Sequence, residues 1–299
     1  MHYYSFNKYL KDKFNEKVRK ISINAGFSCP HKNLSIEEKG CIFCNEKAFT
    51  RFYDNSVSIK KQIESSIVIG KKKNVNKFIA YFQNGTNTNA SLDILKKTYD
   101  IIKKYPEIVG LSIATRPDCI DDNKLYLIQS YVNKYDVWIE YGMQTIHNST
   151  LEKINRGHSF EQTIDAIKKT SILGIKVGVH IILGLPGENE KDMLKTAKEI
   201  SKLPINGIKF HVLSVFNNTE LANLYYTNKI KVLTKKEYIN IICNFLEYTK
   251  KDCVILRLVS DANNDFLIEP KWINNKLLVL NDIEKELIKR QTFQGIYVD

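Results

Sequence analysis

Residues 176–215 read KVGVHIILGLPGENEKDMLKTAKEISKLPINGIKFHVLSV, and the pattern of side chains changes twice within them. The segments 176–184 and 207–215 are apolar and rich in β-branched residues, which is typical of buried strands. The residues between them begin with acidic side chains and stop at Pro204, which is typical of a helix. A strand, a helix and a second strand in this order predict a parallel pair joined by a right-handed crossover.

The same unit recurs along most of the chain. Four more apolar segments of this kind come earlier, at 18–27, 77–84, 110–116 and 136–144. Stretches with helical spacing lie between the strands and stop at residues such as Pro106 and Gly174. Six βα units fall short of the eight that close a full barrel, so the sequence predicts an α/β fold, a partial (β/α)6 TIM-like barrel with an open side. Such sheets bind ligands beyond the carboxyl ends of their strands, where we expect the chemistry.

The pattern changes after about residue 230. A helix is expected at 235–250, then a strand at 253–259 and a tail. We therefore expect a core domain over residues 1–255 and a short α/β C-terminal extension, residues 256–299, packed on the core.

Composition limits the class of protein. The chain has 299 residues, 43% of them hydrophobic and 26% charged, which indicates a globular protein. It holds no apolar run of the ~18 residues that would span a bilayer and no apolar signal-peptide core, so we expect a cytoplasmic protein without a membrane partner. The formal charge of +12 is compatible with RNA as a partner and also with a solvated lysine-rich surface. Only six of the 45 basic residues are arginines, so an arginine beside a strand end is informative.

Three of the six cysteines fall within sixteen residues. Residues 29–44 read CPHKNLSIEEKGCIFC and directly follow the first predicted strand. Clustered cysteines in a reducing compartment more often bind metal than form disulfides. Thiolates from Cys29, Cys41 and Cys44 suit a [4Fe–4S] cluster, in which the fourth iron keeps an open position. The alternative is a zinc site in which His31 adds a fourth ligand to the same cysteines.

Other strand ends carry polar and glycine-rich strings. They are Gln83–Thr88 after the second strand, Ala114–Asp118 after the third, Glu140–Thr145 at the fourth and His180–Glu188 at the fifth. Glu140 and Gln144 lie on one face of their strand because side chains alternate. A charged group on a buried barrel face needs a partner, which is either a ligand or a lysine such as Lys209.

These strings together resemble the radical S-adenosylmethionine superfamily. The three cysteines match its cluster motif, with Phe43 before the last one, although the first gap is eleven residues rather than the common three. The string from His180 to Glu188 resembles the adenine-contacting segment of the superfamily. Together with the strings Glu140–Gln144 and Arg156–His158, this segment most resembles the radical proteins that are grouped with the catalytic subunit of Elongator. Within that group the chain resembles a bacterial stand-alone family without an acetyltransferase domain, over roughly residues 15–260.

The resemblance implies two cofactors, a [4Fe–4S] cluster on the three cysteines and S-adenosylmethionine. A reduced cluster cleaves S-adenosylmethionine to a 5′-deoxyadenosyl radical, with flavodoxin or ferredoxin as the expected electron donor. The residues expected to contact S-adenosylmethionine are Gln83, Asn84, Thr86, His180, Gly184 and Pro186. Gln83 stands where many members have an acid, and a glutamine offers a carbonyl without negative charge. His180, like His211, is equally well explained as a packed core histidine.

The resemblance also implies a substrate. Elongator-type relatives modify the wobble uridine of tRNA, so we expect tRNA as the partner. More narrowly, we expect conversion of a 5-carboxymethylaminomethyl side chain to the aminomethyl form. The candidate catalytic side chains are Arg116, Glu140, Gln144, Arg156 and Lys209. Arg116, Arg156 or Lys209 would hold the carboxylate of the substrate, although Arg116 is also placed to pair with Asp118.

Two other functions stay open from the sequence. One is a radical enzyme that acts on a small metabolite or a peptide. The other is a zinc-binding, non-enzymatic RNA-binding protein. The colour of the purified protein separates the last from the other two, because an iron–sulfur protein is brown.

Overall fold

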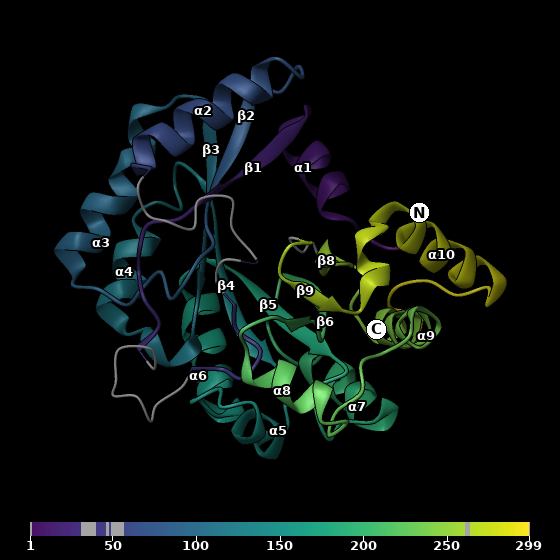
Figure 1. The fold of residues 1–299 in the computed structure, drawn as a ribbon. Helices are drawn as coiled ribbons and strands as arrows, with labels where there is room; N and C mark the ends of the chain where they lie inside the picture. The colour runs from purple at the N-terminus through teal and green to yellow at the C-terminus, as the bar shows by residue number, and fades with distance from the viewer. Residues whose placement is uncertain (1, 31–39, 46–47, 49–56, 261–263, 299) are drawn as a thin grey trace.

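One curled parallel sheet organises the chain (Figure 1). The computed structural model describes residues 2–30, 40–45, 48, 57–260 and 264–298. Within them, seven strands lie in the order β1 (Val18–Ile23), β2 (Lys77–Phe82), β3 (Ile108–Thr115), β4 (Asp136–Gln144), β5 (Lys176–Leu183), β6 (Gly207–Val212) and β8 (Val254–Arg257). Every neighbouring pair is parallel. The predicted partial barrel is therefore confirmed, and the segment expected at 253–259 supplies its seventh strand.

Helices between the strands cover the outer face of the curl (Figure 1). The helices are α1 (Phe6–Phe14), α2 (Ile59–Lys71), α3 (Leu92–Tyr99), α4 (Asp122–Gln129), α5 (Asn148–Lys153), α6 (Phe160–Ile172), α7 (Glu190–Ile200), α8 (Glu220–Tyr226), α9 (Lys235–Glu247) and α10 (Lys276–Lys289), with short 3-10 turns at Asp100–Lys104, Pro117–Cys119 and Lys271–Asn274. In the part of the chain that the structure describes, no helix is long and apolar enough to cross a membrane.

Local sequence explains where several helices begin. Ser159, Asn189 and Thr234 each accept a hydrogen bond from a backbone N–H in the first turn of the helix that follows. The side chain three positions later accepts a hydrogen bond from the backbone N–H of the cap residue, which completes a capping box. These boxes satisfy N–H groups that would otherwise lack partners and so fix the starts of α6, α7 and α9.

The amino-terminal end of the barrel is closed by α1 and a buried carboxylate. Asp136 accepts hydrogen bonds from the Tyr9 hydroxyl and from the Trp138 indole N–H, at 2.8 and 2.9 Å. The ammonium groups of Lys13 and Lys176 lie 2.7 and 2.8 Å from the same carboxylate. Hydrogen bonds from the two lysines hold the pKa of Asp136 below its usual range, although burial opposes this shift. These contacts anchor α1 against the amino-terminal ends of the strands.

The C-terminal part of the chain packs beside β8. Strands β7 (Val215–Phe216) and β9 (Leu267–Glu269) form a small antiparallel pair, and α10 lies against α9 (Figure 1). The two ends of the chain meet here, because the backbone N–H of Gln294 donates to the carbonyl of His2. The expected division at residue 255 falls within β8, which belongs to the main sheet, and a two-part organisation stays a prediction.

The side chain of Gln294 also holds the two ends of the chain together, and replacing it tests how much this contact stabilises the fold. It accepts from the N–H of Tyr4 at 2.8 Å and donates to the carbonyls of Lys250 and Cys253 at 2.6 and 2.7 Å. Gln294 is buried, so Gln294→Ala would leave these groups without partners and should lower the free energy of unfolding by about 2 kcal/mol. Urea unfolding measures the loss. The exposed Gln291→Ala is the matched control and should change stability by no more than ~0.5 kcal/mol; equal losses in the two variants would contradict the assignment.

Candidate active site

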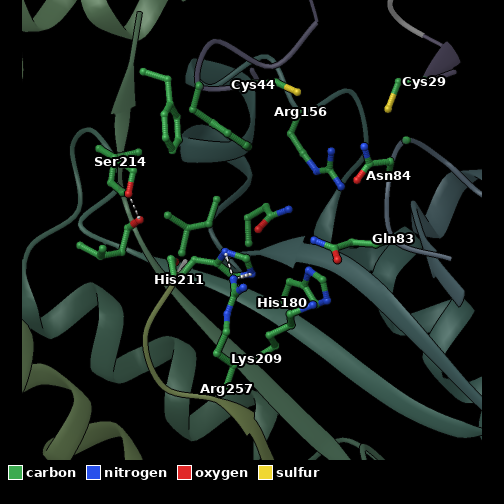
Figure 2. A pocket seen from close by; sticks show the side chains of 18 of the residues that line it. Cys29, Cys44, Gln83, Asn84, Arg156, His180, Lys209, His211, Ser214 and Arg257 are labelled. Atoms are coloured by element: carbon green, nitrogen blue, oxygen red, sulfur yellow. Dashed lines mark hydrogen bonds between the residues drawn. The ribbon is translucent and has the colours of Figure 1, made fainter. Parts of the chain in front are cut away.

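A cavity of about 440 Å³ opens at the carboxyl ends of the strands (Figure 2). Eight of the residues predicted from the sequence line it: Cys29, Cys44, Gln83, Asn84, Gln144, Arg156, His180 and Lys209. Apolar side chains complete much of the wall, among them Phe43, Ile182, Leu213 and Phe216. The cavity therefore combines thiols, amides and cations inside a largely apolar wall, which is the usual composition of a small-molecule site.

Glu140 lies behind the cavity floor, fully buried in β4. Its Oε1 accepts from Lys20 and from the Ser112 hydroxyl, both at 2.6 Å. Its Oε2 lies 2.9 Å from His180 Nε2 and 3.1 Å from Lys209 Nζ. Burial would raise the pKa of this carboxyl, but the positive charges of Lys20 and Lys209 hold it well below its usual range. Glu140 is therefore an anion within the barrel, and its expected pairing with Lys209 is present.

The floor itself carries groups with lowered pKa values. Burial lowers the pKa of Lys209 to about 7, and repulsion from Arg257 adds to this effect while Glu140 opposes it. Burial and the charge of Lys209 lower the pKa of His180 to about 4. Burial and Arg257 hold the pKa of His211 well below its usual range. Both histidines are consequently neutral near pH 7.

Arg156 connects the backbone of β4 at Gly142 with the loop that carries Cys41. Its Nε and Nη2 donate to the carbonyl of Gly142 at 3.1 and 2.7 Å, and its Nη1 donates to Cys41 Sγ at 3.5 Å. A Cβ on Gly142 would lie 2.3 Å from Nη2 of Arg156, so only glycine leaves room for this guanidinium. Gln144, two residues after Gly142, has φ of 73°, a left-handed backbone conformation at the last residue of β4, and its side chain lines the cavity.

Arg116 does not line the cavity but braces this arginine. Its Nε and Nη2 form a two-point contact with Asp118 at 2.9 and 2.7 Å, as one sequence interpretation expected. Its Nη1 donates to the backbone carbonyl of Arg156 at 2.7 Å. Because Arg116 is buried and engaged in this way, it holds the loop that carries Arg156, and its expected contact with a substrate stays a prediction.

The three motif cysteines lie in the same region, and their side chains are half-buried. Cys29 Sγ lies 3.1 Å from the hydroxyl of Thr86, and the backbone N–H of Cys44 donates to the carbonyl of Cys41 in a tight turn. Among the residues that the structure describes, no three cysteine, histidine or acidic side chains gather as closely as a metal site requires. His31 of the zinc alternative lies outside the described residues. Three thiols are nevertheless the donor set that iron–sulfur clusters take, so these residues fit such a group.

Comparison with protein families identifies the fold. The model of the radical SAM superfamily matches residues 29–200, and the radical SAM C-terminal domain matches residues 205–289. The chain belongs to the radical SAM superfamily. Membership of this superfamily confirms the predicted cofactors, a [4Fe–4S] cluster and S-adenosylmethionine, at the level of the family. Which residues of this radical SAM chain hold them stays a prediction.

Relatives extend along most of this radical SAM chain. An uncharacterised protein of Methanocaldococcus jannaschii is 40% identical over 96% of this chain and 89% of its own length. The tRNA uridine(34) acetyltransferase of the same organism is 33% identical, but over 45% of this chain and 25% of its own length. Archaeal Elp3 of Methanocaldococcus infernus superposes with a TM-score of 0.67 at 20% identity, covering 90% of this chain and 63% of that chain. The likeness to Elp3 shows a shared fold.

The lining of the cavity differs from the predicted set at several positions. Gly184 and Pro186 are not among the described lining residues; Gly184 instead has φ of 86° and packs near Leu233, and both stay predicted contacts. Sequence reasoning missed the lining residues Arg257 and Ser260. Arg257 carried a signal, because it is one of six arginines and stands at the end of a predicted strand.

His158, which contacts the same Gly142 carbonyl as Arg156, should make the stability of the protein depend on pH. Burial and the charge of Arg156 lower its pKa to about 4, and its Nε2 lies 3.1 Å from the carbonyl of Gly142. Between pH 6.5 and 4 the unfolded chain binds a proton on this residue that the folded chain does not, so stability falls as pH falls. The free energy of unfolding of the wild-type protein should fall between pH 7.5 and pH 5. In His158→Gln this fall should be smaller by about 2 kcal/mol. Urea unfolding at the two pH values measures this difference, and an identical pH dependence in both proteins would refute the assignment.

Proposed function

We propose that the chain is a radical SAM enzyme that holds its cluster on Cys29, Cys41 and Cys44 and remodels the wobble uridine of tRNA. The reaction that we propose converts a 5-carboxymethylaminomethyl side chain to the aminomethyl form. The observation that carries the proposal is the layout of the cavity, with motif thiols at one end and buried cations at the other. Flavodoxin or ferredoxin is the proposed electron donor.

Different residues that line the cavity have different roles in the proposed reaction. When bound, the cluster and S-adenosylmethionine supply a deoxyadenosyl radical that abstracts hydrogen from the substrate. Gln83 and Asn84 line the wall at the cysteine end and offer amide donors and acceptors to S-adenosylmethionine. Arg156, fixed by the carbonyl of Gly142, presents a guanidinium beside Cys41. Apolar side chains such as Ile182 and Phe216 keep water away from the reacting atoms.

The choice of tRNA rests on charge and on relatives. The net charge of +12 favours contact with a polyanion. A relative named as a tRNA uridine(34) acetyltransferase shares 33% identity over 137 residues, and the fold is that of archaeal Elp3. We therefore place tRNA ahead of a small metabolite or a peptide as the substrate.

The cysteine motif is tested by spectroscopy and product analysis. Anaerobically purified and reduced protein should be brown and should form 5′-deoxyadenosine from S-adenosylmethionine. Cys41→Ala removes one thiol ligand and should abolish both properties. Cys243→Ala is the matched control, because this buried thiol lies in α9 and should leave both unchanged. Colourless wild-type protein with tightly bound zinc would support the non-enzymatic alternative instead.

The substrate is tested in the cell. Deleting the gene should deplete aminomethyl-type wobble uridines in bulk tRNA and accumulate the carboxymethylaminomethyl precursor. Mass spectrometry of tRNA nucleosides measures both. A plasmid copy of the gene should restore the profile, whereas the Cys41→Ala copy should not. If the nucleoside profile does not change on deletion, tRNA is the wrong substrate and a small metabolite or peptide takes its place.

A further inference from the structure

One lysine stands at the end of the cavity away from the cysteines. Among the described residues that line the cavity, Lys209 is the only lysine. Its side chain is 8% exposed, so it is mostly buried but still lines the cavity. Figure 2 shows it beside His180 and Arg257, with Cys29 and Cys44 at the far end of the view. A small molecule in the cavity therefore contacts a lysine side chain that is largely withdrawn from bulk water.

The carboxylate behind the floor already has a counter-ion other than this lysine. Glu140 accepts from Lys20 and from the Ser112 hydroxyl, both at 2.6 Å. Lys209 lies farther away, with its Nζ 3.1 Å from Oε2 of Glu140. One negative charge thus faces two lysines, and a second buried ammonium group that is not fully neutralised is costly. A structural ion pair with Glu140 therefore explains Lys20 better than it explains Lys209.

The surroundings of Lys209 favour its neutral amine. Burial lowers the pKa of Lys209 to about 7; repulsion from Arg257 and Lys20 adds to this effect, and Glu140 opposes it. A large fraction of this lysine is therefore the free amine near pH 7, and the free amine is the nucleophilic form. The charged and titratable groups that face it come from six strands: Lys20 of β1, Tyr81 of β2, Glu140 of β4, His180 of β5, His211 of β6 and Arg257 of β8.

Two neighbours of this amine are able to carry protons. The Nζ of Lys209 donates to the hydroxyl of Tyr81 and to Oε2 of Glu140. Burial, together with the charge of Glu140, holds the pKa of Tyr81 well above its usual range, so this phenol keeps its proton. Formation and breakdown of a Schiff base need a proton donor and a proton acceptor beside the amine. The phenol and the carboxylate are such a pair.

We propose that Lys209 is a nucleophile that forms a Schiff base with a small carbonyl compound. The identity of this compound rests on the proposed function: it is the two-carbon fragment that leaves the wobble side chain. The deoxyadenosyl radical takes a hydrogen atom from the carboxymethyl carbon beside the nitrogen, and an oxidised iron–sulfur cluster takes one further electron. The substrate is then an iminium ion, with a double bond between the nitrogen and the carboxymethyl carbon. A neutral amine exchanges with an iminium ion without any other oxidant or reductant.

The exchange balances in atoms and in charge. The neutral Nζ of Lys209 adds to the iminium carbon, and one proton passes from Nζ to the nitrogen of the wobble side chain by way of Tyr81 and Glu140. The bond between that nitrogen and the carboxymethyl carbon then breaks. The aminomethyl uridine leaves with the electron pair, and the two carbons stay on Lys209 as an iminium ion. Water adds to this ion and releases glyoxylate, and Lys209, now an ammonium ion, returns one proton to solvent before the next cycle.

Trapping with glyoxylate tests the nucleophile without RNA. Cyanoborohydride reduces the adduct to N-carboxymethyl-lysine, and peptide mass spectrometry of the holoenzyme locates it. At pH 7 Lys209 should be labelled roughly tenfold faster than the exposed lysines, because far more of it is the free amine. Its rate should level off above about pH 7, whereas the rates at exposed lysines should keep rising with pH. A rate and a pH profile at Lys209 like those of exposed lysines would overturn the proposal.

Lys20→Met tests the electrostatic cause of the free amine. Without the ammonium group of Lys20, the charge of Glu140 acts on Lys209 alone, so the midpoint of the labelling profile should move up by about one pH unit. Lys202→Met, which removes an exposed lysine paired with Glu199, is the matched control and should leave the midpoint in place. The same midpoint in both variants would contradict this cause. The labelling of wild-type protein tests the nucleophile whether or not Lys20→Met folds.

A carbon-13 label in the carboxymethyl group separates failure of the nucleophile from failure of the tRNA proposal. The reduced holoenzyme receives S-adenosylmethionine and an anticodon stem-loop with labelled 5-carboxymethylaminomethyluridine, and cyanoborohydride is added during turnover. Labelled carboxymethyl-lysine at Lys209 would support the proposal. Aminomethyl product without label at Lys209 would overturn it and leave tRNA as the substrate. If no aminomethyl product forms, the tRNA proposal fails, and the glyoxylate experiment decides alone whether Lys209 is a nucleophile for carbonyl compounds.

Discussion

Glu140 has to remain charged in the dry interior of the curled sheet, and much of the molecule is arranged around that requirement. It draws Lys20 from β1, Ser112 from β3, His180 from β5 and Lys209 from β6 to one point. The side chains that reach it come from strands on both sides of β4, so the contacts hold the sheet in its curl. A buried ionic group of this kind costs desolvation energy, and its value lies in selecting one arrangement of strands.

The same carboxylate divides the interior into two chemically distinct ends. On one side the arginine bridge from Arg116 through Arg156 to Cys41 ties the third and fourth strand ends to the cysteine loop. On the other side the lysine that Glu140 holds stands beside Arg257. The two ends of the cavity therefore present different chemistry, with thiols at one end and basic side chains at the other.

Much of this arrangement could be predicted from the sequence, for a physical reason. Parallel strands that are buried on both faces consist of short apolar segments rich in β-branched residues. β4, for example, is buried at all nine positions. The six main strands could therefore be predicted from the sequence. The polar residues at strand ends followed from the topology, since parallel strands end at one edge. Arg257 was not predicted as a site residue, because its place depends on β8 joining the far edge of the sheet beside β6. That neighbour is chosen by closure of the tertiary structure, and no local pattern encodes it. For Gly184, the positive φ is one reason for a glycine at this position, and its contact with S-adenosylmethionine stays a prediction.

The hydrogen bonds of Gln294 bear on the order in which the two ends of the cavity are completed during synthesis. A ribosome makes the chain from its amino terminus at roughly 5–20 residues per second, so residues 29–44 emerge long before the cationic floor. The strand that carries Arg257 is hydrogen-bonded to the first residues through the N–H of Ile255 and the carbonyl of Tyr4. The contacts of Gln294 with Tyr4 and Cys253 fasten this edge last. The three motif thiols have therefore been synthesised while the opposite end of the cavity is still unmade.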